Sequence, residues 1–166
     1  MGVGKRLSNM VSIEIRPPFE NEAEAINALI KRVFMECVAP DYSVEGIQFF
    51  LGFCSTEVVL KKISETGQII VAVERNEVLG VIQVRDTNHI SRYFVDVNYQ
   101  RKGIGRQLFN YLLEGIKKNY PDVDEITVNS SPFARKAYEG LGFRATDNEQ
   151  VGNGMKYIPM VYKINN

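Results

Sequence analysis

The chain has 166 residues, of which 45% are hydrophobic and 24% are charged, a composition typical of one globular domain with a buried core. Its 20 basic and 20 acidic residues cancel, so no overall charge attracts nucleic acid or a membrane surface, and any anion site must be local. The only cysteines, Cys37 and Cys54, lie far apart without a neighbouring histidine, which argues against a disulfide framework or a zinc site.

Membrane and export signals are not found in the sequence. No run of 18 apolar residues predicts a membrane span, and residues 1–10 lack the hydrophobic stretch of a signal peptide. We therefore expect a cytoplasmic protein. Residues 1–10 are predicted to be a disordered tail and residues 11–166 a single domain.

The first part of the chain predicts a strand followed by helices. Residues 11–17 alternate apolar and polar side chains up to a proline pair, which indicates a strand. Residues 20–37 place apolar side chains at helical spacing behind acidic ones, which indicates a helix. Residues 43–53 and 57–67 are predicted to be further helices, the second ending at Gly67.

The hydrophobic period changes at residue 68 from that of a helix to that of a strand. Three β-rich runs joined by short turns predict an antiparallel meander. These runs are residues 68–74, 78–86 and 89–97. A helix is predicted at 104–118, because an apolar side chain recurs there at every fourth position.

The last part of the chain predicts a strand at 125–130, a short helix and a final strand at 155–164. The helix follows Ser131 and Pro132, which suit its start, and ends at Gly142. This order of elements predicts the α+β class, with a mixed, mostly antiparallel sheet of about six or seven strands flanked by helices.

The loop at residues 100–106 has the features of an anion site. It is basic, contains Gly103 and Gly105, and lies where the predicted helix begins. A helix start exposes unpaired N–H groups, and glycine lets a ligand approach the backbone, so the loop could hold a pyrophosphate. The alternative is a glycine-rich helix start without a ligand. A dinucleotide fingerprint is excluded, because its third glycine would fall at Leu108, and no Gly-Lys-Ser/Thr ends the loop.

Two blocks together resemble a known family. Gln-x-x-Gly-x-Gly behind a strand, at residues 100–105, resembles the acetyl-CoA-binding signature of the GNAT (GCN5-related N-acetyltransferase) family. The stretch NSSPFARKAYEGLGF, residues 129–143, resembles that family's second block. With the hairpins before them and the strand after them, the resemblance spans roughly residues 11–164. The pair Arg101-Lys102 departs from the commonest pattern, a small residue followed by lysine, but it leaves the glycines intact and adds positive charge.

The resemblance implies a single GNAT-like domain in which two parallel strands splay apart and hold CoA. The pyrophosphate would contact the backbone of the loop, and the pantetheine arm would pair with the main chain of the preceding strand. Polar side chains at the end of the second parallel strand would also contact the arm, although an N-cap is the alternative for Ser131. The residues so assigned are Val95, Asp96, Val97, Gln100, Arg101, Lys102, Gly103, Ile104, Gly105, Arg106, Asn129 and Ser131.

The resemblance also implies catalytic roles. Tyr138 stands at the family's tyrosine position and would donate a proton to the departing thiolate; a core aromatic residue is the alternative. His89, the only histidine, would accept the amine proton, with a water chain or a carboxylate elsewhere as alternatives. A backbone N–H near Val95 would stabilise the oxyanion. Asp96 is not assigned as a base, because strand alternation turns it from the face of Val95 and Val97.

The implied activity is an N-acetyltransferase that moves an acetyl group from acetyl-CoA to a primary amine by direct attack, without a metal. The alternatives are a non-catalytic acyl-CoA-binding or sensing domain and a transferase for another acyl-CoA. The acceptor would be a small-molecule or peptide amine, with no nucleic-acid or membrane partner, and the protein would be a monomer or homodimer. Aromatic residues that would wall the acceptor site, unless they are simply core, are Tyr42, Phe49, Phe50 and Phe53.

Overall fold

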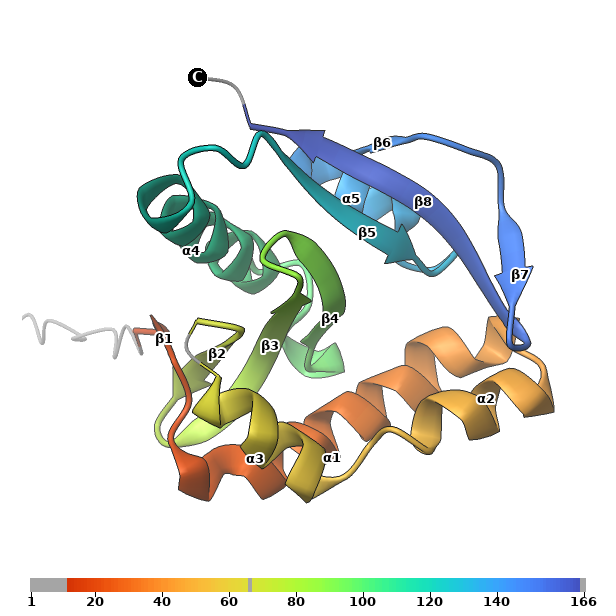
Figure 1. The fold of residues 1–166 in the computed structure, drawn as a ribbon. Coiled ribbons are helices and arrows are strands. Elements are labelled where there is room, and N and C mark those ends of the chain that lie inside the picture. The colour runs from red at the N-terminus through yellow and green to blue at the C-terminus, as the bar shows by residue number, and fades with distance from the viewer. Residues whose placement is uncertain (1–11, 66, 165–166) are drawn as a thin grey trace, which may run out of the picture.

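The computed structural model describes residues 12–65 and 67–164. Helices pack against one mixed sheet, and the predicted α+β class is confirmed (Figure 1). The tail predicted at residues 1–10 lies outside the described residues. The strands are β1 (Glu14–Arg16), β2 (Ile69–Glu74), β3 (Glu77–Arg85), β4 (His89–Val95), β5 (Glu125–Ser130), β6 (Arg144–Ala145), β7 (Gln150–Gly152) and β8 (Met155–Lys163). The helices are α1 (Ala23–Val33), α2 (Val44–Leu51), α3 (Thr56–Ser64), α4 (Ile104–Asn119) and α5 (Arg135–Leu141), and short 3-10 or π turns lie at Glu20–Glu22, Phe34–Val38, Ala39–Asp41 and Val97–Tyr99.

The sheet order is β1-β2-β3-β4-β5-β8-β6, and β7 pairs with β8. Strands β2, β3 and β4 form the predicted three-strand antiparallel meander, and β1 pairs antiparallel with β2. Strands β4 and β5 are parallel neighbours. The sheet has eight strands in the described residues rather than six or seven. The additional strands β6 and β7 have two and three residues, too few for an alternating pattern to mark them in the sequence.

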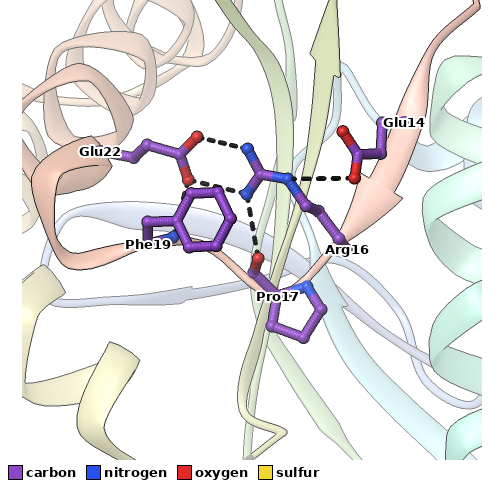
Figure 2. Close-up of polar contacts among 5 residues, drawn as sticks. All are labelled: Glu14, Arg16, Pro17, Phe19 and Glu22. Carbon is purple, nitrogen blue, oxygen red and sulfur yellow. Dashed lines mark hydrogen bonds and ion pairs between the residues drawn. The ribbon is translucent and has the colours of Figure 1, made fainter. Parts of the chain in front are cut away.

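The entry into α1 is fixed by Arg16 at the end of β1 (Figure 2). Its guanidinium donates to both carboxylate oxygens of Glu22, at 2.6 and 2.9 Å, and to the carbonyl oxygen of Pro17 at 3.0 Å. The same guanidinium lies 4.1 Å from the centre of the Phe19 ring, and the Phe19 N–H donates to Glu22. The hydrogen bond from Arg16 lowers the pKa of Glu22. These contacts determine where the chain turns from the sheet edge into the first helix.

Helices on both faces of the meander explain why its strands are almost continuously apolar. Helices α1 and α3 cover one face, where Ile26, Ile30 and Val71 belong to one buried cluster. Helix α4 covers the other face with the apolar stripe predicted from its spacing, which includes Leu108 and Leu112. Strand β3 is consequently buried from Val78 to Val84, as expected for a strand enclosed on both sides.

The parallel pair β4 and β5 separates soon after it forms. Only His89 with Thr127 and Ile90 with Val128 are paired between the two strands. Beyond this point β4 stays paired with β3, and β5 stays paired with β8 through Ser130. The sheet therefore opens between the carboxyl ends of β4 and β5 (Figure 1).

Candidate active site

A pocket occupies the opening between β4 and β5, and we call it the central pocket. One side is formed by β4 residues 90–95, and the other by the end of β5, the following turn and α5. Side chains from the segment between α1 and α2 close the pocket on the α1 face of the sheet. Besides β4, its wall contains Val33, Phe34, Cys37, Val38, Tyr42, Phe50, Gln100, Val128, Asn129, Ser131, Phe133, Ala134 and Tyr138.

The end of β4 leaves main-chain groups at the open edge. The backbone N–H of Asp96 donates to the carbonyl of Leu79 on β3 at 2.8 Å. Since successive residues of a strand direct their N–H groups to opposite edges, the N–H of Val95 is directed to the open side. The Val95 carbonyl accepts from Nε2 of Gln100 at 3.0 Å. The N–H of Val95 therefore lies at the open edge, and its role as an oxyanion donor stays a prediction.

Strand β4 ends at Val95, two residues earlier than predicted. The Asp96 side chain accepts from the N–H of Asn98 at 2.9 Å and from Arg32 at 2.8 Å, and so caps the 3-10 turn Val97–Tyr99. The backbone carbonyl of Asp96 accepts from Tyr99. Asp96 and Val97 do not line the central pocket. Strand-like pairing of a ligand with this segment is therefore restricted to residues up to Val95.

The predicted helix begins at Ile104, and the N–H groups of its first turn are unpaired within the helix. Its first intrahelical bond is donated by Gln107 to the carbonyl of Gly103. The N–H groups of residues 104–106 therefore have no intrahelical partner. Arg101, Lys102 and Arg106 are exposed around this terminus, and no carboxylate of the described residues forms a salt bridge with them. Unpaired donors and positive charge fit a pyrophosphate.

The two glycines of the loop have different reasons to be glycine. Gly103 has a φ of 85°, a left-handed conformation that side chains disfavour, and open space lies where its Cβ would be. Gly105 has an ordinary φ, but a Cβ there would lie 3.2 Å from the hydroxyl of Tyr93. Gly103 therefore makes the turn, and Gly105 lets β4 approach α4.

Tyr138 lies on α5 in the wall of the central pocket, with 5% of its surface exposed. Its ring packs 5.7 Å from the ring of Tyr93 and 5.3 Å from that of Phe143, measured between ring centres. Burial, reinforced by the neighbouring Tyr93, raises the pKa of Tyr138 well above its ordinary value. The hydroxyl is protonated at neutral pH and can donate a hydrogen bond.

His89 is placed apart from Tyr138. It does not line the central pocket; it lines a second hollow, here called the outer hollow, together with Glu125, Thr127, Arg144, Thr146 and Lys163. Nδ1 of His89 is hydrogen-bonded to Oγ1 of Thr127 at 2.8 Å. Thr127 alternates with Ile126 and Val128, which share the buried cluster of Tyr138. His89 and Tyr138 thus lie on opposite faces of the sheet.

Aromatic residues form the pocket wall on the α1 face. Phe34 and Phe50 stack with ring centres 3.8 Å apart, and Tyr42 meets Phe34 edge-on. Of the four aromatic residues predicted to wall an acceptor site, Tyr42 and Phe50 line the pocket. Phe49 and Phe53 do not, and 39% and 55% of their surfaces are exposed.

Arg92 and Phe94 also line this side, and neither was predicted from the sequence. Phe94 meets Phe50 edge-on, at 6.1 Å between ring centres. Arg92 is 8% exposed, and its Nη2 donates to the carbonyl of Phe53 at 2.8 Å. The signal that could have identified Arg92 is a charged residue in the middle of a central strand, since buried charges occur mostly with a partner or a function.

The polar residues predicted at the end of β5 reach the central pocket. Asn129 and Ser131 both line it. Oγ of Ser131 also accepts from the N–H of Ala134 at 3.2 Å and so caps the turn before α5. The helix itself begins at Arg135 with Ala134 as its N-cap, so the interpretation of Ser131 as the helix N-cap is wrong by three residues. Gln100, the first residue of the loop motif, lines the pocket through its side chain, whereas the prediction concerned its backbone.

In residues 12–65 and 67–164, no three His, Cys, Asp or Glu side chains gather in a group that could hold a metal ion. Within the same residues, no helix combines the length and the apolar character needed to cross a bilayer.

Residues 38–164 match the acetyltransferase (GNAT) domain family. A comparison with curated proteins found no match. Among solved structures, the PaiA N-acetyltransferase from Thermoplasma acidophilum in complex with coenzyme A is similar, with a TM-score of 0.77 and 19% identity over 92% of this chain and 99% of that one. A GCN5-related N-acetyltransferase from Rhodopseudomonas palustris gives a TM-score of 0.78 and 20% identity over 92% of this chain and 96% of that one.

A third similar structure is the N-acetylglutamate synthase from Neisseria gonorrhoeae, complexed with coenzyme A and N-acetyl-glutamate. Its TM-score is 0.69 at 14% identity, over 93% of this chain and 36% of that one. At these identities the three structures demonstrate a shared fold and leave the acceptor undetermined.

Proposed function

The chain belongs to the GNAT family of acetyltransferases, and we propose that it transfers an acetyl group from acetyl-CoA to a primary amine by direct attack. Acyl transfer from CoA is the reaction of the family. The observation that carries the proposal is the central pocket, which lies in the opening between β4 and β5 and is walled by α5 on one face and aromatic residues on the other. A donor and an acceptor can meet there from opposite faces of the sheet.

Three features support acetyl-CoA as the donor. The start of α4 has unpaired N–H groups among exposed basic side chains, where a pyrophosphate would bind. Each charge-assisted hydrogen bond at such a site is worth about 1.5–3 kcal/mol. The open edge of β4 up to Val95 would pair with the amide groups of the pantetheine arm, and Asn129 and Ser131 line the other side of the opening. When bound, acetyl-CoA supplies the activated thioester.

Val95 and Tyr138 are proposed to act on opposite ends of the reacting group. The N–H of Val95 would stabilise the negative charge that develops on the carbonyl oxygen. The hydroxyl of Tyr138 would donate a hydrogen bond to the departing thiolate. Because the pKa of Tyr138 is raised and a thiol has a pKa of about 8.5, complete proton transfer from this tyrosine is unfavourable. We therefore assign it stabilisation of the thiolate rather than full protonation.

Removal of the amine proton is assigned to solvent. A lysine-like amine has a pKa of about 10.4 and is mostly protonated at neutral pH. No carboxylate or histidine of the described residues lines the central pocket, and His89 faces the outer hollow. The role predicted for His89 would require water to connect the two sites.

The proposal is tested with the purified chain, acetyl-CoA and a panel of primary amines. Release of free thiol, together with a product that has gained one acetyl group by mass spectrometry, is the expected result. CoA at about 100 times its dissociation constant should raise the melting temperature by roughly 5–10 °C.

The outcomes separate the two alternatives retained from the sequence. A melting shift with CoA but no turnover across the panel would indicate a binding or sensing domain. Turnover only with longer acyl-CoA donors would indicate a different acyl specificity. The absence of both a melting shift and turnover would contradict the proposal.

A further inference from the structure

Arg92 is the only charged side chain in the wall of the central pocket formed by the described residues. It projects from β4 on the same face as Phe94, toward the aromatic wall of Phe50 and away from α4. Its guanidinium carbon lies 5.7 Å from the centre of the Phe50 ring. The positive charge of Arg92 therefore lies on the side of the pocket opposite Tyr138, where an acceptor would enter.

The guanidinium is held but not neutralised. Nη2 donates to the Phe53 carbonyl at 2.8 Å, while Nη1 is buried without a hydrogen-bond partner. No carboxylate of the described residues forms a salt bridge with Arg92. A buried arginine without a counter-charge is unfavourable for the folded protein, because water no longer solvates its charge. Such a residue is expected where a ligand provides the missing anion.

We propose that Arg92 binds a carboxylate of the acceptor, so that the acceptor is a small amino carboxylate such as an amino acid. This inference rests on the proposed acetyl transfer. A guanidinium suits a carboxylate because its planar N–H groups match the two oxygens. Arg92 precedes Val95 by three residues, which is about 10 Å along a strand. The amine and the carboxylate would then both lie within one pocket, which favours a small molecule over a peptide.

The contact requires a modest movement of the side chain. Nη1 is shielded from solvent in this conformation, so the guanidinium must turn toward the pocket when the carboxylate enters. Arginine has several torsions with staggered alternatives, and a turn about the last of them leaves the backbone in place.

The alternative is that Arg92 has a purely structural role, and the experiment must distinguish this role from binding of a carboxylate. Gln83 is the register partner of Arg92 on β3, and its buried Oε1 also lacks a hydrogen-bond partner. A water molecule between the two side chains would satisfy both atoms. Arg92 would then stabilise the sheet and the turn at Phe53 without contacting an acceptor. In that case its replacement would lower the melting temperature and affect all acceptors alike.

The experiment measures kcat/KM for matched pairs of acceptors, each an amino carboxylate and its primary amide. Glycine, β-alanine, 4-aminobutyrate, 5-aminopentanoate and lysine vary the distance between amine and carboxylate. We expect the wild-type protein to prefer the best carboxylate over its amide by about 10- to 100-fold. Arg92→Met should reduce this ratio to near one, and Arg92→Lys should retain part of it. Arg85→Gln, which removes an exposed arginine of β3, should leave the ratio unchanged.

Several outcomes overturn the inference while acetyl transfer stands. These are equal use of carboxylates and amides by the wild type, an unchanged ratio in Arg92→Met, and acetylation confined to peptides. If no amine is acetylated, the binding of a carboxylate by Arg92 is tested without turnover, by comparing the melting temperature of the protein with N-acetyl amino acids and with their amides. Stabilisation by the carboxylates alone, lost in Arg92→Met, supports the inference even when the proposed transfer fails. Equal shifts, or no shift with either set, contradict it.

Discussion

The hydroxyl of Tyr93 donates a hydrogen bond to the carbonyl oxygen of Gly105, which joins the end of β4 to the first turn of α4. This contact is possible because Gly105 has no side chain in the path of the tyrosine. The same Tyr93 packs against Tyr138 across the opening of the sheet. One aromatic side chain thus links the proposed pyrophosphate site with the residue proposed to stabilise the thiolate.

Alanine substitutions at three glycines should separate conformation from close packing. Gly103→Ala should cost about 1–2 kcal/mol, because its φ of 85° is strained for a residue with a Cβ. Gly105→Ala should cost about 1–3 kcal/mol, because it displaces Tyr93. Gly115→Ala, inside α4 with open space around it, should stabilise by about 0.5–1 kcal/mol. Urea unfolding measures all three, and a destabilised Gly115→Ala would contradict the account.

Asp96→Ala should destabilise the protein by about 1–3 kcal/mol in urea unfolding. The carboxylate is buried, caps the turn after β4 through the Asn98 N–H, and pairs with Arg32. Arg32→Gln is the matched control. Since Arg32 is half exposed, removing its charge should cost less than about 1 kcal/mol. Equal losses in the two variants would mean that the cap contributes little.

Local sequence patterns determined most of the fold. The strand predicted at 125–130 is β5 with the same bounds, and α4 begins at Ile104 as predicted. Both segments have strong periodicity and clear boundary residues. Strand β4 was predicted two residues too long, because Val97 continues the β-rich composition while the Asp96 cap ends the strand. Side-chain capping within a β-rich run carries no periodic signal.

The faces of β4 could not be predicted from alternation alone. His89 and Val95 are six residues apart, so a regular strand would direct them to the same face. The register of β4 against β3 shifts between Ile90 and Arg92. The extra residue at this bulge reverses the sheet face toward which the preceding side chains of β4 are directed. Ile90 consequently joins the cluster under α4, and His89 turns to the other face. The bulge separates His89 from Tyr138, and no residue in the sequence marks it.

Tyr138→Phe should lower kcat of acetyl transfer by about 10- to 100-fold, because it removes one hydrogen bond to a charged leaving group. The dissociation constant of CoA should change by less than about twofold, since the ring and its packing remain. Tyr111→Phe, at an exposed position of α4, is the control and should behave as wild type. Full activity of Tyr138→Phe would remove this hydroxyl from the mechanism.

His89→Gln should retain most of the transfer activity, because His89 faces the outer hollow rather than the central pocket. The substitution should instead change how the free energy of unfolding depends on pH. Burial, and then the positive charge of Arg85, lower the pKa of His89 below its ordinary value. The unfolded chain therefore binds the proton more readily, so stability from the neutral imidazole is present above about pH 6.5 and falls as the pH decreases through the folded-state value.

Since this is the only histidine, His89→Gln should flatten the change in unfolding free energy just below pH 6.5, measured by urea unfolding at several pH values. Asp86→Asn supplies a matched test on the neighbouring charge. The Asp86 carboxylate raises the pKa of His89, so its removal should steepen the loss of stability in acid. A large fall in kcat for His89→Gln, with CoA binding intact, would instead place this imidazole in the proton path and require a water connection between the two sites.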